Sequence, residues 1–118
     1  MPWIYNQFTG ELFHNDKFVG KGYSGKGEHK NQPASESIKN WGPIPKGTYI
    51  IGGYNNNKGP MTIILNPAIN NVMYGRNAFR IHGDSISSPG NASEGCIILG
   101  PHIRINIIHS SDRVLTVI

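Results

Sequence analysis

"GPIPKGTYIIGGYNNNKGPMTIILN" is the sequence of residues 42–66, and this stretch decides the fold class of the chain. Two short runs, residues 48–51 and residues 59–66, are rich in the β-branched and aromatic side chains that favour strands. The segment between them, "GGYNNNKG", is typical of a turn, because glycine and asparagine adopt the backbone angles that tight turns need. The stretch therefore predicts two adjacent strands joined by a turn, in a chain that is mainly β.

The same alternation of apolar runs and turn residues continues on both sides of this stretch. It predicts, in chain order, a hairpin of residues 3–8 and 11–14 with Thr9-Gly10 at its turn, a long loop over residues 20–36, a strand over residues 78–84, a short helix over residues 101–110 and a last strand over residues 113–118. The isoleucines of residues 101–110 also alternate as a strand would, but Pro101 suits the first turn of a helix.

Length and composition fit one folded domain over residues 1–118. The chain has 118 residues, 37% of them hydrophobic and 15% charged, which is not the composition of a disordered chain. Its 15 glycines and 8 prolines favour turns and short strands over long helices. We therefore expect a small domain with a single apolar core.

Charge and hydropathy exclude several classes of partner. The net charge is +4, but the lysines and arginines are scattered, so we expect no nucleic-acid partner. No run of eighteen apolar residues exists, so we expect no membrane span. The first residues lack a basic region followed by an apolar stretch, which predicts synthesis in the cytoplasm without a signal peptide. A basic surface also favours attraction to an anionic polymer such as a bacterial envelope.

Cys96 is the only cysteine, so it forms no internal disulfide and is either a buried apolar residue or a reactive thiol. Before it, Arg80, His82 and Asp84 alternate along the expected strand and share one face. The apolar residues that alternate with them face the core. The polar face is therefore directed at a cleft or at solvent.

This segment has the residue types that nucleophilic catalysis by a thiol requires. His82 is the candidate base for Cys96, and Asp84 is a candidate to orient the imidazole. The main-chain N–H groups of Gly95 and Cys96 are candidates for holding an oxyanion. Gly83 and Gly95 leave room for a substrate or a neighbouring backbone.

Longer motifs along the chain resemble those of a known family. "IHGD" and "SEGC", at residues 81–84 and 93–96, resemble the His-Gly and Ser-x-Gly-Cys signature of YkuD-type L,D-transpeptidase domains. The resemblance is closer to a group of type VI secretion effectors with L,D-transpeptidase and L,D-carboxypeptidase activity. The matching elements are Trp3, Tyr5, "GYSG" at 22–25, "NQP" at 31–33, "GPIPKGTY" at 42–49, "GRNAFRIHGD" at 75–84 and "SEGCII" at 93–98.

The resemblance implies a compact, L,D-transpeptidase-like β-sandwich or barrel with one or two short helices. It implies an enzyme that attacks the L,D bond between the third residue and D-alanine of the tetrapeptide stem of peptidoglycan. A thioester acyl-enzyme would then react with water or with an amine, without a metal or other cofactor. The implied site consists of the nucleophile Cys96, the base His82, the matching aspartate Asp84, and the shaping residues Ser93, Gly95 and Gly83.

Two positions depart from the common pattern of L,D-transpeptidases. Many of those enzymes have histidine where this chain has Glu94, and arginine where it has Ile98. Arg80 and Arg76 are the candidates to replace that arginine, and Arg80 shares the face of His82. The resemblance also implies an antibacterial toxin that is secreted, acts in the periplasm of target bacteria and has a cognate immunity protein.

Other interpretations of the same residues stay open. A papain-like peptidase needs its cysteine before its histidine, the reverse of the order here. A zinc site could use His82, Asp84 and His102, but no HxxEH-type spacing supports it. A non-catalytic peptidoglycan-binding module would bury Cys96 as a core residue.

Overall fold

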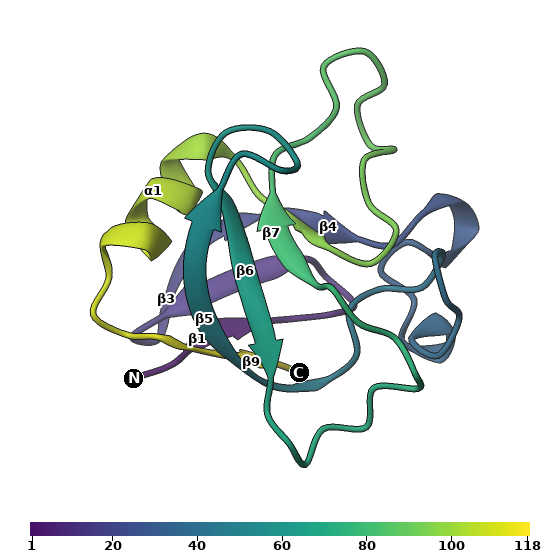
Figure 1. Cartoon of the computed structure of the whole chain (residues 1–118), viewed down its shortest axis with the longest axis horizontal. Coiled ribbons are helices and arrows are strands. Elements are labelled where there is room, and N and C mark those ends of the chain that lie inside the picture. Colours follow the sequence, from purple (N-terminus) through teal and green to yellow (C-terminus); the bar gives the residue numbers. More distant parts are fainter.

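Nine strands form one sheet in the computed structural model, which describes residues 1–118 (Figure 1). The strands are β1 (Trp3–Tyr5), β2 (Glu11–His14), β3 (Lys17–Lys21), β4 (Tyr23–Ser24), β5 (Gly47–Asn55), β6 (Thr62–Pro67), β7 (Arg80–His82), β8 (Ile97–Ile98) and β9 (Val114–Val117). The helices are α1 (Pro101–His109) and two 3-10 turns, η1 (Gly27–His29) and η2 (Pro33–Ser35). The predicted mainly-β fold with a short helix is confirmed.

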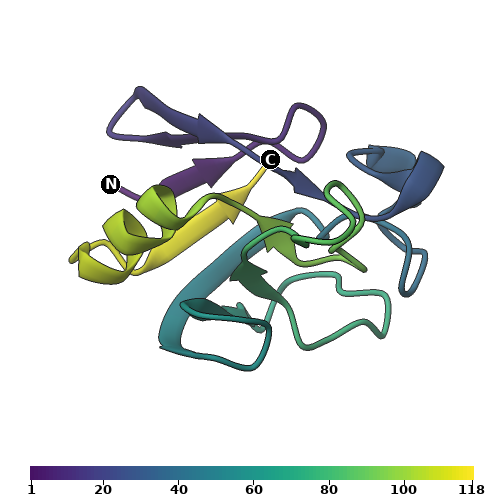
Figure 2. The same cartoon turned by 90° about the horizontal axis from the view of Figure 1, so that it is seen from above.

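The order of the strands makes the sheet curl on itself. The order is β3-β2-β1-β9-β5-β6-β7-β8-β4, so β3 and β4 lie at its two ends. Only Gly22 separates these two strands along the chain, which brings the two ends of the sheet together in a nearly closed barrel (Figure 2). Strand β9 pairs in parallel with β1 and antiparallel with β5, and so joins the two halves of the sheet.

Alternation along β5 decides which face of the sheet forms the core. Tyr49 and Ile51 are buried, whereas Ile50 between them is 47% exposed. This is the pattern of a strand that faces the core on one side and water on the other. The buried side belongs to a cluster of 15 apolar residues drawn from β1, β2, β5 to β9, α1 and their loops. Burial of apolar surface of this kind is the main favourable term in folding.

Several predicted elements differ in extent from the structure. Strand β5 continues to Asn55, through residues that were predicted to form a turn, and β6 begins only at Thr62. Strand β1 ends at Tyr5, before the predicted residue 8, because the Asn6 side chain accepts hydrogen bonds from the N–H groups of Phe8 and Thr9 and starts the turn early. The predicted strand over residues 78–84 is shortened to β7, because Ala78 has a φ of +63° that interrupts the extended backbone.

A further difference concerns residues 20–36, which were predicted to form a long loop. They contain β4, because Tyr23 and Ser24 pair antiparallel with Ile98 and Ile97 of β8. They also contain both 3-10 turns. Two residues are too few for the period-two alternation to be recognised in the sequence.

Helix α1 begins at Pro101, as predicted, and packs against the tip of the β5–β6 hairpin. The Arg104 side chain donates from Nε to the Leu99 carbonyl at 3.0 Å and from Nη1 to the Pro60 carbonyl. Arg104 is therefore buried with its hydrogen bonds satisfied, and it fixes the hairpin tip beside the end of β7.

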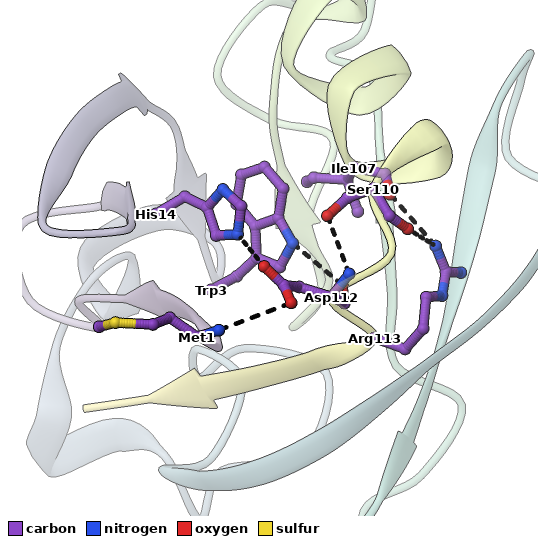
Figure 3. Close-up of polar contacts among 7 residues, drawn as sticks. All are labelled: Met1, Trp3, His14, Ile107, Ser110, Asp112 and Arg113. Carbon is purple, nitrogen blue, oxygen red and sulfur yellow. Dashed lines mark hydrogen bonds and ion pairs between the residues drawn. The ribbon is translucent and has the colours of Figure 1, made fainter.

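A polar cluster ties the β1–β2 hairpin to the loop between α1 and β9 (Figure 3). The Trp3 indole stacks on the His14 imidazole, with ring centroids 3.9 Å apart. His14 Nε2 lies 2.6 Å from a carboxylate oxygen of Asp112, and the indole N–H donates to the Asp112 carbonyl at 3.2 Å. Arg113 donates to carbonyls at the end of α1 and to that of Gly52. These contacts fix the point at which β9 enters the sheet.

Candidate active site

Strands β7 and β8 bring His82 and Cys96 into one cleft. The two strands are parallel neighbours, with Ile81 opposite Ile97. Cys96 directly precedes β8, and the same register sets it opposite Arg80. Side chains at alternate positions of a strand share a face, so Arg80 and His82 lie on one side of β7. All three line a cleft of about 250 Å³.

The His82 imidazole is neutral at neutral pH, with its proton on a known nitrogen. Nδ1 lies 2.9 Å from the Gly83 carbonyl, which can only accept, so Nδ1 carries the hydrogen and Nε2 keeps its lone pair. Burial lowers the pKa of His82, and the positive charges of Lys58, Arg104 and Arg80 lower it further, against the opposing effect of the Gly83 hydrogen bond. His82 therefore has the protonation state of a general base.

The Cys96 thiol is also neutral in the resting site. Burial raises its pKa, and this outweighs a main-chain hydrogen bond from Arg80 and the positive charges of Arg80 and Lys58, which lower it. The side chain is nevertheless half-buried and lines the cleft, so it is accessible to a ligand. A neutral thiol has to lose its proton before the sulfur can act as a nucleophile.

The turn that carries Cys96 is held by the buried hydroxyl of Ser93. Its Oγ accepts hydrogen bonds from the N–H groups of Gly25 (2.9 Å) and Gly95 (3.0 Å) and donates to the Cys96 carbonyl at 2.5 Å. The Gly95 N–H, a predicted oxyanion donor, is therefore already used. The Cys96 N–H has no acceptor in the protein and keeps its hydrogen available. Ser93 thus shapes the turn and has no free hydrogen for a ligand.

Gly95 is required at its position for two reasons. Its φ of +141° is strained for any residue with a side chain. A Cβ there would also lie 2.5 Å from the Arg76 guanidinium and 2.8 Å from the Phe79 ring. The thiol can therefore follow this turn only if the preceding residue is glycine.

Arg76 fastens the wall of the cleft rather than projecting freely into it. It is buried, and its guanidinium donates to the carbonyls of Glu36, Gly42, Pro43 and Glu94 at 2.6–3.2 Å. These bonds join the loop before β5 to the turn before Cys96. With its donors used in this way, Arg76 contributes positive charge to the cleft and rigidity to its wall.

The cleft as a whole is cationic. Its charged lining consists of four cations and one carboxylate, namely Lys39, Lys58, Arg76, Arg80 and Glu94. None of them forms an ion pair, because the two ion pairs of the protein both involve Asp112. Unpaired positive charge around a partly enclosed space attracts anionic ligands.

The chain resembles one known protein family over most of its length. The family model described as Tlde1 domain matches residues 19–116. The chain belongs to the Tlde1 domain family. The family is one of type VI secretion L,D-transpeptidase effectors, so this Tlde1 domain is a secreted effector with activity related to peptidoglycan. No curated protein and no solved structure matches the chain significantly.

The alternation predicted that Asp84 orients the imidazole. In this Tlde1 domain, however, Asp84 makes no hydrogen bond to His82. Strand β7 ends at His82, so the alternation of faces does not extend to Asp84. Its carboxylate instead accepts a hydrogen bond from the Tyr23 hydroxyl at 2.6 Å. The Gly83 carbonyl takes the position at Nδ1 that was expected for Asp84. A side chain at residue 83 would clash with Arg104, since a Cβ there would lie 2.8 Å from its guanidinium.

Sequence reasoning missed the cations that reach the cleft from loops. Lys39 follows η2 and Lys58 lies in the tip of the β5–β6 hairpin, and neither belongs to a motif. No group of three His, Cys, Asp or Glu side chains is arranged to hold a metal ion. The only α-helix, α1, is too short to cross a membrane.

Proposed function

We propose that this Tlde1 domain is a YkuD-type cysteine enzyme that breaks the L,D bond between the third residue and D-alanine of the peptidoglycan tetrapeptide stem. The observation that carries the proposal is that Cys96 and His82 line one cleft whose unpaired charges are mostly positive. A stem peptide carries several carboxylates, so its charge suits this cleft. The family relationship supports the same class of substrate.

The first half-reaction forms a thioester. His82 Nε2 takes the proton of the Cys96 thiol as the sulfur attacks the carbonyl carbon of the third residue. The free Cys96 N–H is the main-chain donor suited to the negative charge that develops on the carbonyl oxygen. The C–N bond then breaks, and His82 returns the proton to the nitrogen, so D-alanine leaves as a neutral amine group.

The second half-reaction releases the acyl group. Water attacks the thioester carbonyl and His82 takes its proton. As the carbon–sulfur bond breaks, His82 returns that proton to the sulfur, which restores the thiol and gives the carboxypeptidase product. If the amine of a D-amino acid attacks instead, the product is an exchanged stem. Both branches restore Cys96 and need no cofactor.

We further propose that the protein acts as an antibacterial toxin in the periplasm of target bacteria. Membership of a type VI secretion effector family implies secretion, and it also suggests a cognate immunity protein. A protein that covers the Cys96 cleft would prevent self-intoxication.

The test is a digest of purified Gram-negative muropeptides, with and without D-methionine, followed by mass spectrometry. We expect tetrapeptides to lose D-alanine or to exchange it for D-methionine. Cys96→Ala should abolish both reactions, and His82→Ala should slow them by about 10²–10⁴-fold. His102→Ala is the matched control, because this exposed histidine lies outside the cleft, and it should keep full activity.

Two results would argue against the proposal. Full turnover by Cys96→Ala would exclude the thioester. Binding of muropeptides without any change in mass would favour the non-catalytic binding module.

A further inference from the structure

The "GYSG" motif of residues 22–25 holds the segment that connects His82 to Cys96. The Tyr23 side chain is not packed into the core, and its hydroxyl bridges two points of the β7–β8 loop. It donates to Asp84 Oδ1 at 2.6 Å and accepts from the Ala92 N–H at 3.0 Å. One phenol therefore fastens the loop two residues after the base and four residues before the thiol.

Asp84 extends this fastening into the loop. Its carboxylate accepts from the N–H of Ser85 at 2.8 Å and from that of Gly90 at 3.1 Å. The Lys30 ammonium lies 4.5 Å from the centre of the Tyr23 ring, on the same group of residues. These bonds close the loop into a ring around the carboxylate, and the Tyr23 hydroxyl joins that ring to β4.

The next two residues of the motif hold the other end of the loop. Ser24 Oγ donates to the Gly95 carbonyl at 2.8 Å, and the Gly25 N–H donates to Ser93 Oγ. Strand β4 itself pairs with β8, directly after Cys96. The motif therefore contacts the β7–β8 connection at both of its ends, through side chains and backbone.

We propose that Tyr23 is a positioning residue for the cysteine reaction, acting through Asp84 and Ala92 to keep the Cys96 turn in register with His82. The inference rests on the proposed function. It also assigns Asp84 a role different from that of a catalytic residue, because Asp84 acts on the loop and not on the imidazole. The hydroxyl matters, and the aromatic ring alone does not suffice.

The kinetic test compares Tyr23→Phe with Tyr54→Phe on muropeptides. Tyr54 is an exposed tyrosine of β5 whose hydroxyl has no hydrogen bond, so its variant controls for loss of a phenol. We expect Tyr23→Phe to lower kcat by about tenfold and to leave KM within about twofold of the wild type. The free energy of a hydrogen bond to a charged group corresponds to about a tenfold change in rate. Tyr54→Phe should match the wild type. A Tyr23→Phe kcat within about twofold of the wild type, or a loss carried by KM, would overturn the inference.

A double variant shows whether the hydroxyl acts through the carboxylate. Asp84→Asn is an exposed change that leaves the core intact. If the Tyr23 hydroxyl acts through the Asp84 carboxylate, the double variant Tyr23→Phe/Asp84→Asn should be no slower than the slower single variant. Multiplication of the two single losses would mean that Tyr23 does not act through Asp84, contrary to the inference.

Hydrogen exchange tests whether the Tyr23 hydroxyl holds the β7–β8 loop, and it does not depend on turnover. Tyr23→Phe removes the acceptor of the Ala92 amide, whose exchange should become about tenfold faster, whereas Tyr54→Phe should leave it unchanged. Faster exchange of the Ala92 amide in a protein that lacks all Cys96-dependent turnover would refute the proposed function, but it would support the contact of Tyr23 with the loop. If Tyr23→Phe changes neither the exchange nor the kcat of an active enzyme, the positioning role of Tyr23 is refuted and the proposed function is not.

Discussion

Replacement of Ser93 by alanine should destabilise the protein, because the Ser93 hydroxyl holds the turn that carries Cys96. The Ser93 hydroxyl is fully buried and makes three hydrogen bonds, to Gly25, Gly95 and Cys96. Ser93→Ala leaves three main-chain groups without their partner. Each unsatisfied buried group costs about 1–3 kcal/mol, so the low end of this range gives a loss of about 3 kcal/mol in the free energy of unfolding.

The measurement is urea unfolding followed by tryptophan fluorescence. A loss of this size should lower the urea midpoint by about 2 M, for an m value of about 1.5 kcal/mol per M. Turnover of muropeptides should fall as well, because the same bonds position the nucleophile. Ser37→Ala is the control, since Ser37 is exposed and makes no side-chain hydrogen bond, and its effect should stay within about 0.5 kcal/mol. A loss below about 1 kcal/mol for Ser93→Ala would refute the role given to this hydroxyl.

Two further predictions concern pH. Because burial lowers the pKa of His82, the base stays neutral below its ordinary value of 6.5, so kcat/KM should hold at pH 6.5 and fall only in more acidic solution; a profile that already falls above pH 7 would contradict this. The hydrogen bond from His14 lowers the pKa of Asp112 below its ordinary 3.8, so the carboxylate stabilises the fold above that pH, and this contribution is lost as the pH falls through the lower folded value. The Tm difference between the wild type and Asp112→Asn should therefore be largest near neutral pH and shrink below about pH 4, whereas a constant difference would exclude the linkage.

The parts of the fold that local pattern predicts are those in which strand-favouring residues extend over several positions. The β5–β6 hairpin was predictable because two runs rich in β-branched and aromatic residues flank a segment of turn residues. Strand β4 was not, because two residues carry no periodic signal and the pairing partner lies more than seventy residues further along the chain. Its presence depends on the closing of the sheet, which is a property of the whole chain.

The candidate site shows the same division. His82 and Cys96 were predicted as a pair from the family motifs that contain them, and the structure places both in one cleft. The alternation that set Asp84 on the face of His82 does not hold, because the end of a three-residue strand is set by the backbone of neighbouring residues. Lys39 and Lys58 reach the cleft from separate loops, and only tertiary structure brings them there.

The place of β9 in the sheet has a consequence for how the protein is made. Every other strand is synthesised before β9, yet β9 supplies the only pairing between β1 and β5. A nascent chain that ends before Val114 therefore holds two strand groups without a common sheet, and contacts between distant residues form late in folding. The pair β7–β8, in which β7 carries His82 and β8 directly follows Cys96, is made before β9, but it is joined to the β1–β3 group only when β9 pairs. The two groups of strands can therefore form one sheet only after residues 114–117 have been synthesised.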